Sequence, residues 1–198
     1  MQHLFYTVEN YLRTGGAVMI PILAASFFMW LLIINRLLFL RRLHIKNIPR
    51  QQAGELIRTD TMPPEKYQGA NSLLVRTFLT RRSHDPELDG FILDETVVGL
   101  VSSLDNHLTA IRALAGAAPL LGLLGTVLGM MGTFDVITTF GTGNARAMAG
   151  GISVALITTQ TGLMVSIPGL YMSGFLSKRA NNLKIRIAAT GIYLKQFL

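Results

Sequence analysis

Two long apolar stretches in the second half of this 198-residue chain constrain its fold more than any other feature. Residues 113–137 and 147–171 are each long enough to cross a bilayer, for which about 20 apolar residues suffice. Neither stretch has a charge in its middle, yet the first contains Thr126 and Thr133, and the second contains four consecutive polar residues at 158–161. Polar groups at membrane depth are costly unless they face a partner helix or water. The pattern therefore predicts two membrane helices that together line something polar.

A third apolar stretch, residues 17–40, predicts another membrane helix near the N-terminus. Arg36 lies near its basic end, from which the guanidinium can reach toward the lipid headgroups. Half of the residues are hydrophobic and there is no cysteine, so disulfides and thiolate metal sites are excluded. We therefore predict an all-α membrane protein with three transmembrane helices.

The placement of the basic residues predicts the orientation in the membrane. The formal net charge is +7, and the bases gather just after the first apolar stretch and in the tail at 177–198, which has no acid. Because cytoplasmic flanks of membrane helices are rich in Lys and Arg, both basic segments are predicted to be cytoplasmic and the N-terminus periplasmic. This arrangement next to the membrane also disfavours nucleic acid as a partner.

The predicted organisation follows from these stretches and their punctuation. It consists of an amphipathic outer-interface helix at 1–16, transmembrane helix 1 at 17–40, a cytoplasmic helical region at 41–112, transmembrane helix 2 at 113–137, a short periplasmic loop at 138–146, transmembrane helix 3 at 147–176 and a basic cytoplasmic helical tail at 177–198.

Within the cytoplasmic region we expect two short helices, at 45–61 and 64–82, and a turn at 83–86 that caps the next helix. Apolar residues then recur at helical spacing up to Ile111 without a Gly-Pro breaker, which predicts an unbroken helix from Glu87 into the second span. The third span likewise continues into the tail. Two helices that extend far into the cytoplasm are typical of a bundle continued by neighbouring subunits.

No enzyme site is predicted. The four histidines are scattered, no Gly-rich phosphate loop is present, and the acids at 85–89 are placed to cap a helix. We therefore expect neither catalytic residues, nor a metal site, nor a cofactor. The glycines of the second span are instead predicted to serve close helix packing, and they are Gly122, Gly125, Gly129 and Gly132.

The hydroxyl-bearing residues are the candidate functional residues. Thr126, Thr158 and Thr159 lie near the middle of two spans, and hydroxyl oxygens can replace part of the water shell of an ion. Possible additional pore-lining residues are Thr133, Ser153, Gln160, Thr161 and Ser166. A membrane threonine can also simply bond to a carbonyl of its own helix. Since Asp135 near the outer end is the only acid close to these spans, an ion path would need a carboxylate from another chain.

Residues 118–134 (APLLGLLGTVLGMMGTF) and 148–169 (MAGGISVALITTQTGLMVSIPG) resemble the ExbB/TolQ/MotA ion-channel family. The order of one span, a cytoplasmic region and two spans resembles ExbB and TolQ, whereas flagellar stator subunits have four spans. The resemblance implies a pentamer in the bacterial inner membrane around the single helices of ExbD- or TolR-like partners. Each partner would supply a membrane aspartate, and ion flow would drive rotation.

The resemblance also implies roles for particular residues. Thr126 and Thr159 match the pore threonines of the family. Proton-type ExbB members carry a glutamate where this chain has Val154, and the Thr158-Thr159 pair is similar to sodium-type stators. Sodium is therefore favoured as the transported ion, with protons as the alternative. Force would pass to the periplasm, through a TonB- or TolA-like protein, to energise transport at the outer membrane. The alternative functions are a non-conducting membrane scaffold and a flagellar-type stator.

Overall fold

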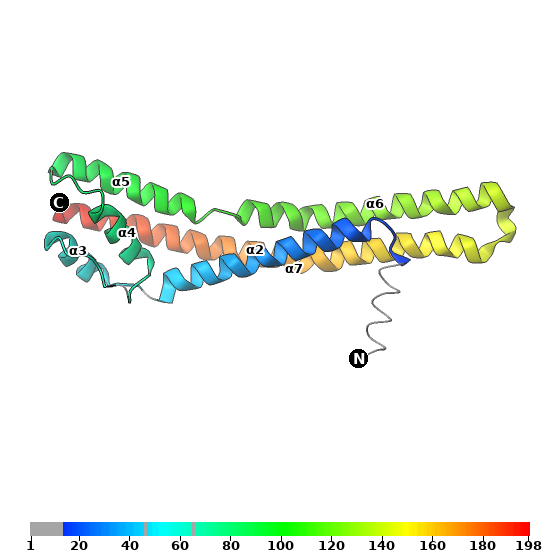
Figure 1. The fold of residues 1–198 in the computed structure, drawn as a ribbon, viewed down its shortest axis with the longest axis horizontal. Coiled ribbons are helices and arrows are strands. Elements are labelled where there is room, and N and C mark those ends of the chain that lie inside the picture. Colours follow the sequence, from blue (N-terminus) through cyan, green and yellow to red (C-terminus); the bar gives the residue numbers. More distant parts are fainter. Residues whose placement is uncertain (1–13, 46, 65) are drawn as a thin grey trace. The chain divides into compact units, whose positions relative to one another are not determined.

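The computed structural model describes residues 14–198 except 46 and 65, and contains helices but no strand in that range (Figure 1). The predicted all-α fold is therefore confirmed. The described elements are α2 (Met19–Ile45), α3 (Arg50–Arg58), α4 (Ala70–Leu79), α5 (Pro86–Ser103), α6 (Leu108–Phe140), η1 (Gly141–Gly143), α7 (Ala145–Leu194) and η2 (Lys195–Phe197). The amphipathic helix predicted at 1–16 lies almost entirely outside the described residues.

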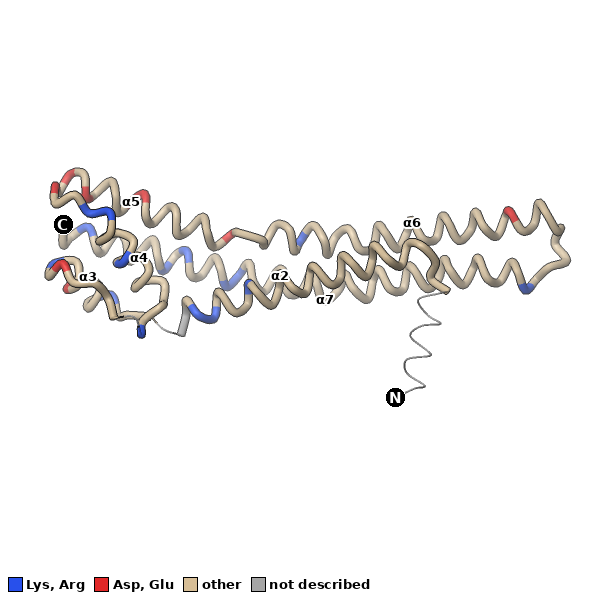
Figure 2. Tube along the Cα trace, viewed as in Figure 1, with Lys and Arg blue, Asp and Glu red and all other residues tan. Residues whose placement is uncertain are grey.

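Three described helical segments are long and apolar enough to cross a membrane, which confirms the three predicted spans. They are Met19–Leu43, Pro86–Gly143 and Ala145–Phe197. The last two are much longer than the ~20 residues that a bilayer needs, so each also extends beyond it. Figure 2 shows long stretches of α2, α6 and α7 without charged residues.

The chain forms two compact units. The first unit consists of Met1–Ile33 and Ala110–Ser173, and the second consists of Ile34–Thr109 and Gly174–Leu198. Parts of α2, α6 and α7 therefore belong to each unit. The first unit holds the candidate residues of the apolar stretches, and the second holds the shorter helices and the tail.

The second unit has its own apolar core. Ile57 of α3, Leu74 and Phe78 of α4 and Leu93 of α5 are all fully buried. Both predicted short helices are present but shorter than expected. Proline precedes α3 at position 49, and the Pro63-Pro64 pair lies between α3 and α4, so the backbone there cannot continue a helix.

The start of α5 confirms the predicted capping turn. The Asp85 carboxylate accepts a hydrogen bond from the Glu87 backbone N–H at 3.1 Å, and Pro86 occupies the first turn. A carboxylate in this position satisfies a backbone donor that the helix leaves unpaired and also interacts favourably with the helix dipole.

The prediction of an unbroken helix from Glu87 into the second span is wrong. A turn at 104–107 separates α5 from α6, and His107 adopts a positive φ of 66°. Arg36 is buried, and its Nη2 donates to the Ser103 carbonyl at 2.8 Å, close to the C-terminal end of α5. The Lys184 ammonium meanwhile lies 2.6 Å from the Asp105 carboxylate in the turn. The Arg36 contact thus satisfies a carbonyl at the end of α5, and the Lys184 pair holds a side chain of the turn. Arg36 therefore binds a helix end rather than reaching toward headgroups.

The prediction that the third span continues into the tail is confirmed, because α7 is uninterrupted over 50 residues. Leu183, Ile187 and Leu194 of its tail are buried in the second unit.

In contrast, α5 exposes three large apolar side chains, Leu88, Phe91 and Val98. Exposed apolar residues at helical spacing are typical of a surface that another chain covers.

A buried carboxylate holds the junction between α4 and α5. Asp89 is 2% exposed and accepts hydrogen bonds from the Ser83 backbone N–H at 2.8 Å, the Ser83 hydroxyl at 3.1 Å and the Arg82 Nε at 3.2 Å. Arg82 also donates to the Ile57 carbonyl at 2.8 Å, which connects the junction to α3. One carboxylate therefore organises three neighbouring elements.

We expect Asp89→Asn to lower the free energy of unfolding by about 1–3 kcal/mol, because buried donors would lose their charged acceptor. Asp94→Asn is the matched control on the same helix, since Asp94 forms a largely exposed ion pair with Lys195. Such pairs contribute about 0–1 kcal/mol. Chemical denaturation followed by circular dichroism measures both variants. Equal losses would contradict a structural role for Asp89.

Candidate ion pathway between two membrane helices

In the first unit, α6 and α7 approach each other through glycines. A Cβ atom added to Gly122 would lie 3.0 Å from the Thr158 carbonyl oxygen, and one added to Gly129 would lie 2.6 Å from the Gly151 carbonyl oxygen. The reverse also holds, since a Cβ on Gly162 would lie 2.6 Å from the Ala118 carbonyl oxygen. The two backbones are therefore in direct contact, as small residues allow in lipid.

The other two predicted packing glycines differ from each other. Gly125 lies directly beneath the side chain of Thr158, so no side chain fits there. Gly132 has no neighbour within 4 Å of an added Cβ in the described part of the chain. Within one chain, the close face of α6 thus runs through 122, 125 and 129, and not through 132.

Sequence reasoning missed the α7 side of this contact. Gly151, Ala155 and Gly162 meet the glycines of α6, and they recur at spacings of four and seven residues. This spacing of small residues was the available signal. Ser173 was also missed. Its hydroxyl is buried and has no hydrogen-bond partner among residues 14–198 as far as the structure describes them, and it lies seven residues after Ser166 on the same helix.

Thr158 is fully buried in the contact between the helices. Its hydroxyl donates to carbonyls of its own helix, with the Val154 oxygen at 2.9 Å and the Ala155 oxygen at 3.1 Å. The side chain packs on Gly125 of α6. In the single chain, Thr158 therefore fills space between two helices and does not face a path.

Three further polar candidates are also buried. The Thr133 hydroxyl donates to the Gly129 carbonyl at 3.0 Å, and the Thr161 hydroxyl donates to the Ile157 carbonyl at 2.7 Å. Ser166 is 2% exposed. The remaining two candidates lie nearer the surface of the chain: Ser153 is half-buried and Gln160 is exposed.

Thr126 and Thr159 are the mid-span threonines that stay half-buried. The Thr126 hydroxyl donates to the Leu123 carbonyl at 2.6 Å. The Thr159 hydroxyl lies 3.1 Å from the Ala155 carbonyl oxygen and 3.3 Å from the Gly122 carbonyl oxygen of α6. Because Gly122 is one helical turn before Thr126, the hydroxyl of Thr159 contacts α6 one turn from Thr126. The structure thus brings these two candidates to one region of the α6–α7 contact.

These hydroxyls keep their capacity to accept. A threonine hydroxyl has one hydrogen and two lone pairs, so donation to a backbone carbonyl leaves the oxygen free to accept a hydrogen bond or to coordinate a cation. Thr126 and Thr159 can therefore interact with a protonated acid or with a metal cation that reaches their exposed side. Neither hydroxyl gains or loses a proton near neutral pH, so neither can relay protons by itself.

The acid that proton or sodium transport would use is not found beside these threonines. Between Arg112 and Lys178 the only acid is Asp135, which is exposed and lies in the last two turns of α6. Val154, the position where the resemblance implies a glutamate, is half-buried, with Cγ1 3.7 Å from a Cβ placed on Gly16. The α6–α7 pair thus offers neutral oxygen ligands without a carboxylate at mid-span.

The model of the MotA/TolQ/ExbB proton channel family matches residues 66–189, which include α4, α5, α6 and most of α7. The chain belongs to this family. The resemblance inferred from residues 118–134 and 148–169 is therefore confirmed. Family membership makes this a channel-type, multi-pass membrane protein rather than a member of an enzyme family.

Individual relatives extend the comparison. The chain is 32% identical over 170 residues to the biopolymer transport protein ExbB-like 3 of Synechocystis, which covers 79% of this chain and 78% of that protein. It is 30% identical over 197 residues to ExbB-like 1 of the same organism, covering 95% and 77%. The Tol-Pal system protein TolQ of Haemophilus influenzae is 35% identical over 81 residues, covering 41% and 36%. Similarity to the ExbB-like proteins therefore extends over most of the chain, and similarity to TolQ over less than half.

Proposed function

We propose that this chain is the ExbB/TolQ-like subunit of an inner-membrane motor that couples ion flow to force transmission across the periplasm. The observation that carries the proposal is the pair of half-buried hydroxyls, Thr126 and Thr159, on two helices in backbone contact and without a carboxylate at mid-span. Such a pair can bind an ion or a protonated acid but cannot move a proton alone. A second protein must therefore supply the acid.

The missing acid defines the partner. We propose an ExbD/TolR-like protein with one membrane helix, whose aspartate comes opposite Thr126 and Thr159. A ring of five copies of this chain would surround the partner helices. The exposed apolar side chains of α5, among them Leu88, Phe91 and Val98, are available for contacts between copies. Force would leave the complex through the periplasmic part of the partner, toward a TonB- or TolA-like protein, and energise transport at the outer membrane.

The orientation follows from charge. We propose that the N-terminus and the loop at 138–146 are periplasmic, and that the region at 41–112 and the tail at 177–198 are cytoplasmic. The basic residues after the first and third spans support this assignment through the positive-inside rule.

Two observations bear on the coupling ion. The family description names protons, whereas a cluster of threonines favours sodium. Because Thr158 is buried against Gly125, the mid-span threonine hydroxyls available from this chain reduce to Thr126 and Thr159. Two neutral oxygens can complete either a sodium shell or a hydrogen-bond chain to a protonated aspartate, so flux measurements decide the ion.

The test is ion flux in proteoliposomes that contain this chain and the single-span partner, with the periplasmic part of the partner removed. Sodium and proton gradients are imposed separately. We expect flux of one ion, and its loss when the membrane aspartate of the partner is replaced by asparagine. An assembled complex that conducts neither ion would contradict the proposal.

A non-conducting scaffold is the second candidate, and one observation favours it. The mid-span threonine hydroxyls all bond to backbone carbonyls, so helix packing alone satisfies their donors. A scaffold predicts that the assembled complex conducts neither ion, and that changes at Thr126 and Thr159 lower only the stability of the complex. The proteoliposome experiment separates the two functions directly.

A further inference from the structure

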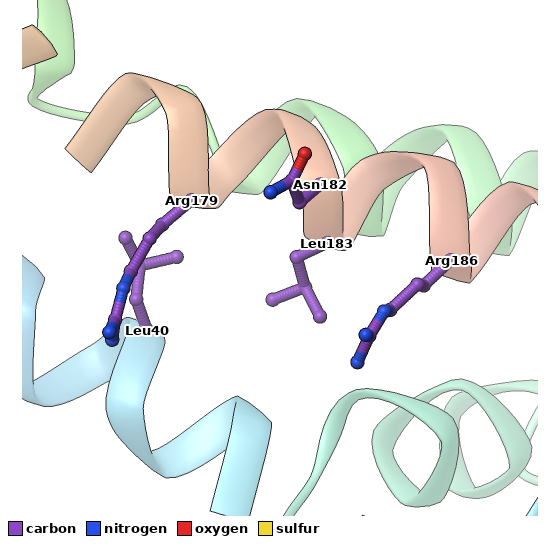
Figure 3. Close-up of a pocket in the computed structure, with 5 residues that line it drawn as sticks. All are labelled: Leu40, Arg179, Asn182, Leu183 and Arg186. Atoms are coloured by element: carbon purple, nitrogen blue, oxygen red, sulfur yellow. The ribbon is translucent and has the colours of Figure 1, made fainter. Parts of the chain in front are cut away.

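A basic pocket lies in the second unit, between α2 and α7. It has a volume of about 190 Å³ and is lined by Leu40, Arg179, Asn182, Leu183 and Arg186. Figure 3 shows Arg179, Leu183 and Arg186 projecting from the same side of α7, with Leu40 of α2 beside Arg179. The two leucines are buried and both arginines are exposed. The pocket therefore combines an apolar floor with two cations seven residues apart.

The two arginines differ from Lys184 and Lys195 of the same tail, which form ion pairs with acids of the described chain. Lys184 is paired with Asp105 at 2.6 Å, and Lys195 forms a similar pair. Among the residues that the structure describes, no carboxylate lies within 4.0 Å of Arg179 or Arg186. Guanidinium groups bind phosphate and carboxylate through paired N–H donors, so this arrangement fits an anion.

One of the arginines is also held in place. The guanidinium carbon of Arg179 lies 4.9 Å from the ring centroid of Phe175, one turn earlier on α7. Stacking on an aromatic face stabilises the cation and limits its conformations. The side chain is thus partly ordered before any anion binds.

The position of the pocket along the helices indicates which anion it binds. No charge occurs on α7 between Arg146 and Lys178, and the apolar run of α2 ends at Leu40, directly before Arg41. Leu38 and Phe175 are 60% and 39% exposed close to the pocket in the chain. Exposed apolar residues followed by cations are typical of the level where hydrocarbon meets headgroups. A small soluble anion would make no favourable contact with that apolar surface, whereas a lipid acyl chain would.

We propose that this pocket binds the headgroup phosphate of an anionic phospholipid, such as phosphatidylglycerol. The phosphate lies between Arg179 and Arg186, and an acyl chain follows the apolar surface of α2 and α7. This site is separate from the ion path and does not depend on the proposed motor function.

The experiment is native mass spectrometry of the full-length chain in its assembled, detergent-extracted form. Phosphatidylglycerol is titrated against phosphatidylcholine with the same acyl chains, and inorganic phosphate is added as a competitor. The variants are Arg179→Gln, Arg186→Gln and the double variant. The matched control is Lys178→Gln with Arg146→Gln, which removes the same charge from two exposed bases outside the pocket.

We expect several-fold preferential binding of phosphatidylglycerol over phosphatidylcholine by the unchanged protein. Each single substitution should weaken it about fivefold, and the double variant about 25-fold, as expected for ~1 kcal/mol per basic residue near a membrane surface. The control should stay within about twofold of the unchanged protein, since neither Lys178 nor Arg146 lines the pocket.

Four results would overturn the proposal. Equal binding of the two lipids by the unchanged protein would do so even if the double variant did not fold. Undiminished phosphatidylglycerol binding by the double variant would also do so. Displacement by inorganic phosphate at equal concentration would assign the pocket to a soluble anion. If the double variant lost its oligomeric state while lipid binding stayed unchanged, the two arginines would be assigned to carboxylates of a neighbouring copy.

Discussion

Replacing Thr159 with valine should reduce partner-dependent ion flux by about tenfold or more while the complex stays assembled. Valine keeps the shape of the side chain and removes only the hydroxyl, which bridges the Ala155 carbonyl and the Gly122 carbonyl of α6. Losing one polar contact to an ion or acid in a water-poor site costs about 1–3 kcal/mol. The measurement is flux in proteoliposomes, normalised to the amount of assembled complex.

Two controls make this result specific. Thr159→Ser keeps the hydroxyl and should retain most of the flux. Thr138→Val removes an exposed hydroxyl that bonds to the Asp135 carbonyl at 2.9 Å near the end of α6, and should leave flux unchanged. If Thr159→Val conducted as well as the unchanged protein, the hydroxyl would have no role in transport. If it conducted poorly only because assembly failed, the hydroxyl would serve assembly of the complex rather than the ion path.

The second large effect is expected at Gly129. A Cβ there would lie 2.6 Å from the Gly151 carbonyl oxygen, and both groups belong to backbones that cannot move independently. Gly129→Ala should therefore force α6 and α7 apart and cost about 1–3 kcal/mol through overpacking. The complex should dissociate at a lower temperature in a heating series followed by size-exclusion chromatography.

Gly132→Ala is the matched control, three residues further along the same helix. An added Cβ meets nothing within 4 Å there in the described part of the chain. Because alanine is favoured over glycine in a helix by about 0.5–1 kcal/mol, this variant should be as stable as the unchanged protein or more so. Similar destabilisation at both positions would mean that contacts between copies, rather than the α6–α7 contact, decide the outcome.

Much of the architecture could be predicted from local sequence. Runs of apolar residues predict helices that cross a bilayer because unpaired backbone groups are too costly in lipid. The three spans and the continuous α7 follow from this. The glycines at 122, 125 and 129 were recognisable because small residues at that spacing permit close helix contact. The cap at Asp85 was recognisable because its interactions are with adjacent residues.

Three features could not be predicted because they depend on distant residues. The turn at 104–107 is stabilised by Arg36 and Lys184, 67 and 79 residues away from their partners in the chain. Gly132 looked like its neighbours, but an added Cβ there meets nothing within 4 Å among the described residues. Leu88, Phe91 and Val98 formed a regular apolar stripe, yet they are exposed in the single chain.

The mid-span threonines show most clearly the difference between what local sequence predicts and what depends on the folded chain. Composition and spacing alone predicted hydroxyls at mid-span on two glycine-faced helices, because they set which segments enter the membrane. Only the tertiary structure distinguished Thr158 from Thr159, which are adjacent in sequence but about 100° apart around α7. That rotation buries Thr158 on Gly125 and leaves Thr159 half-buried at the carbonyl of Gly122. The rotation of each helix about its axis depends on which backbones pack together, and that is a property of the folded chain.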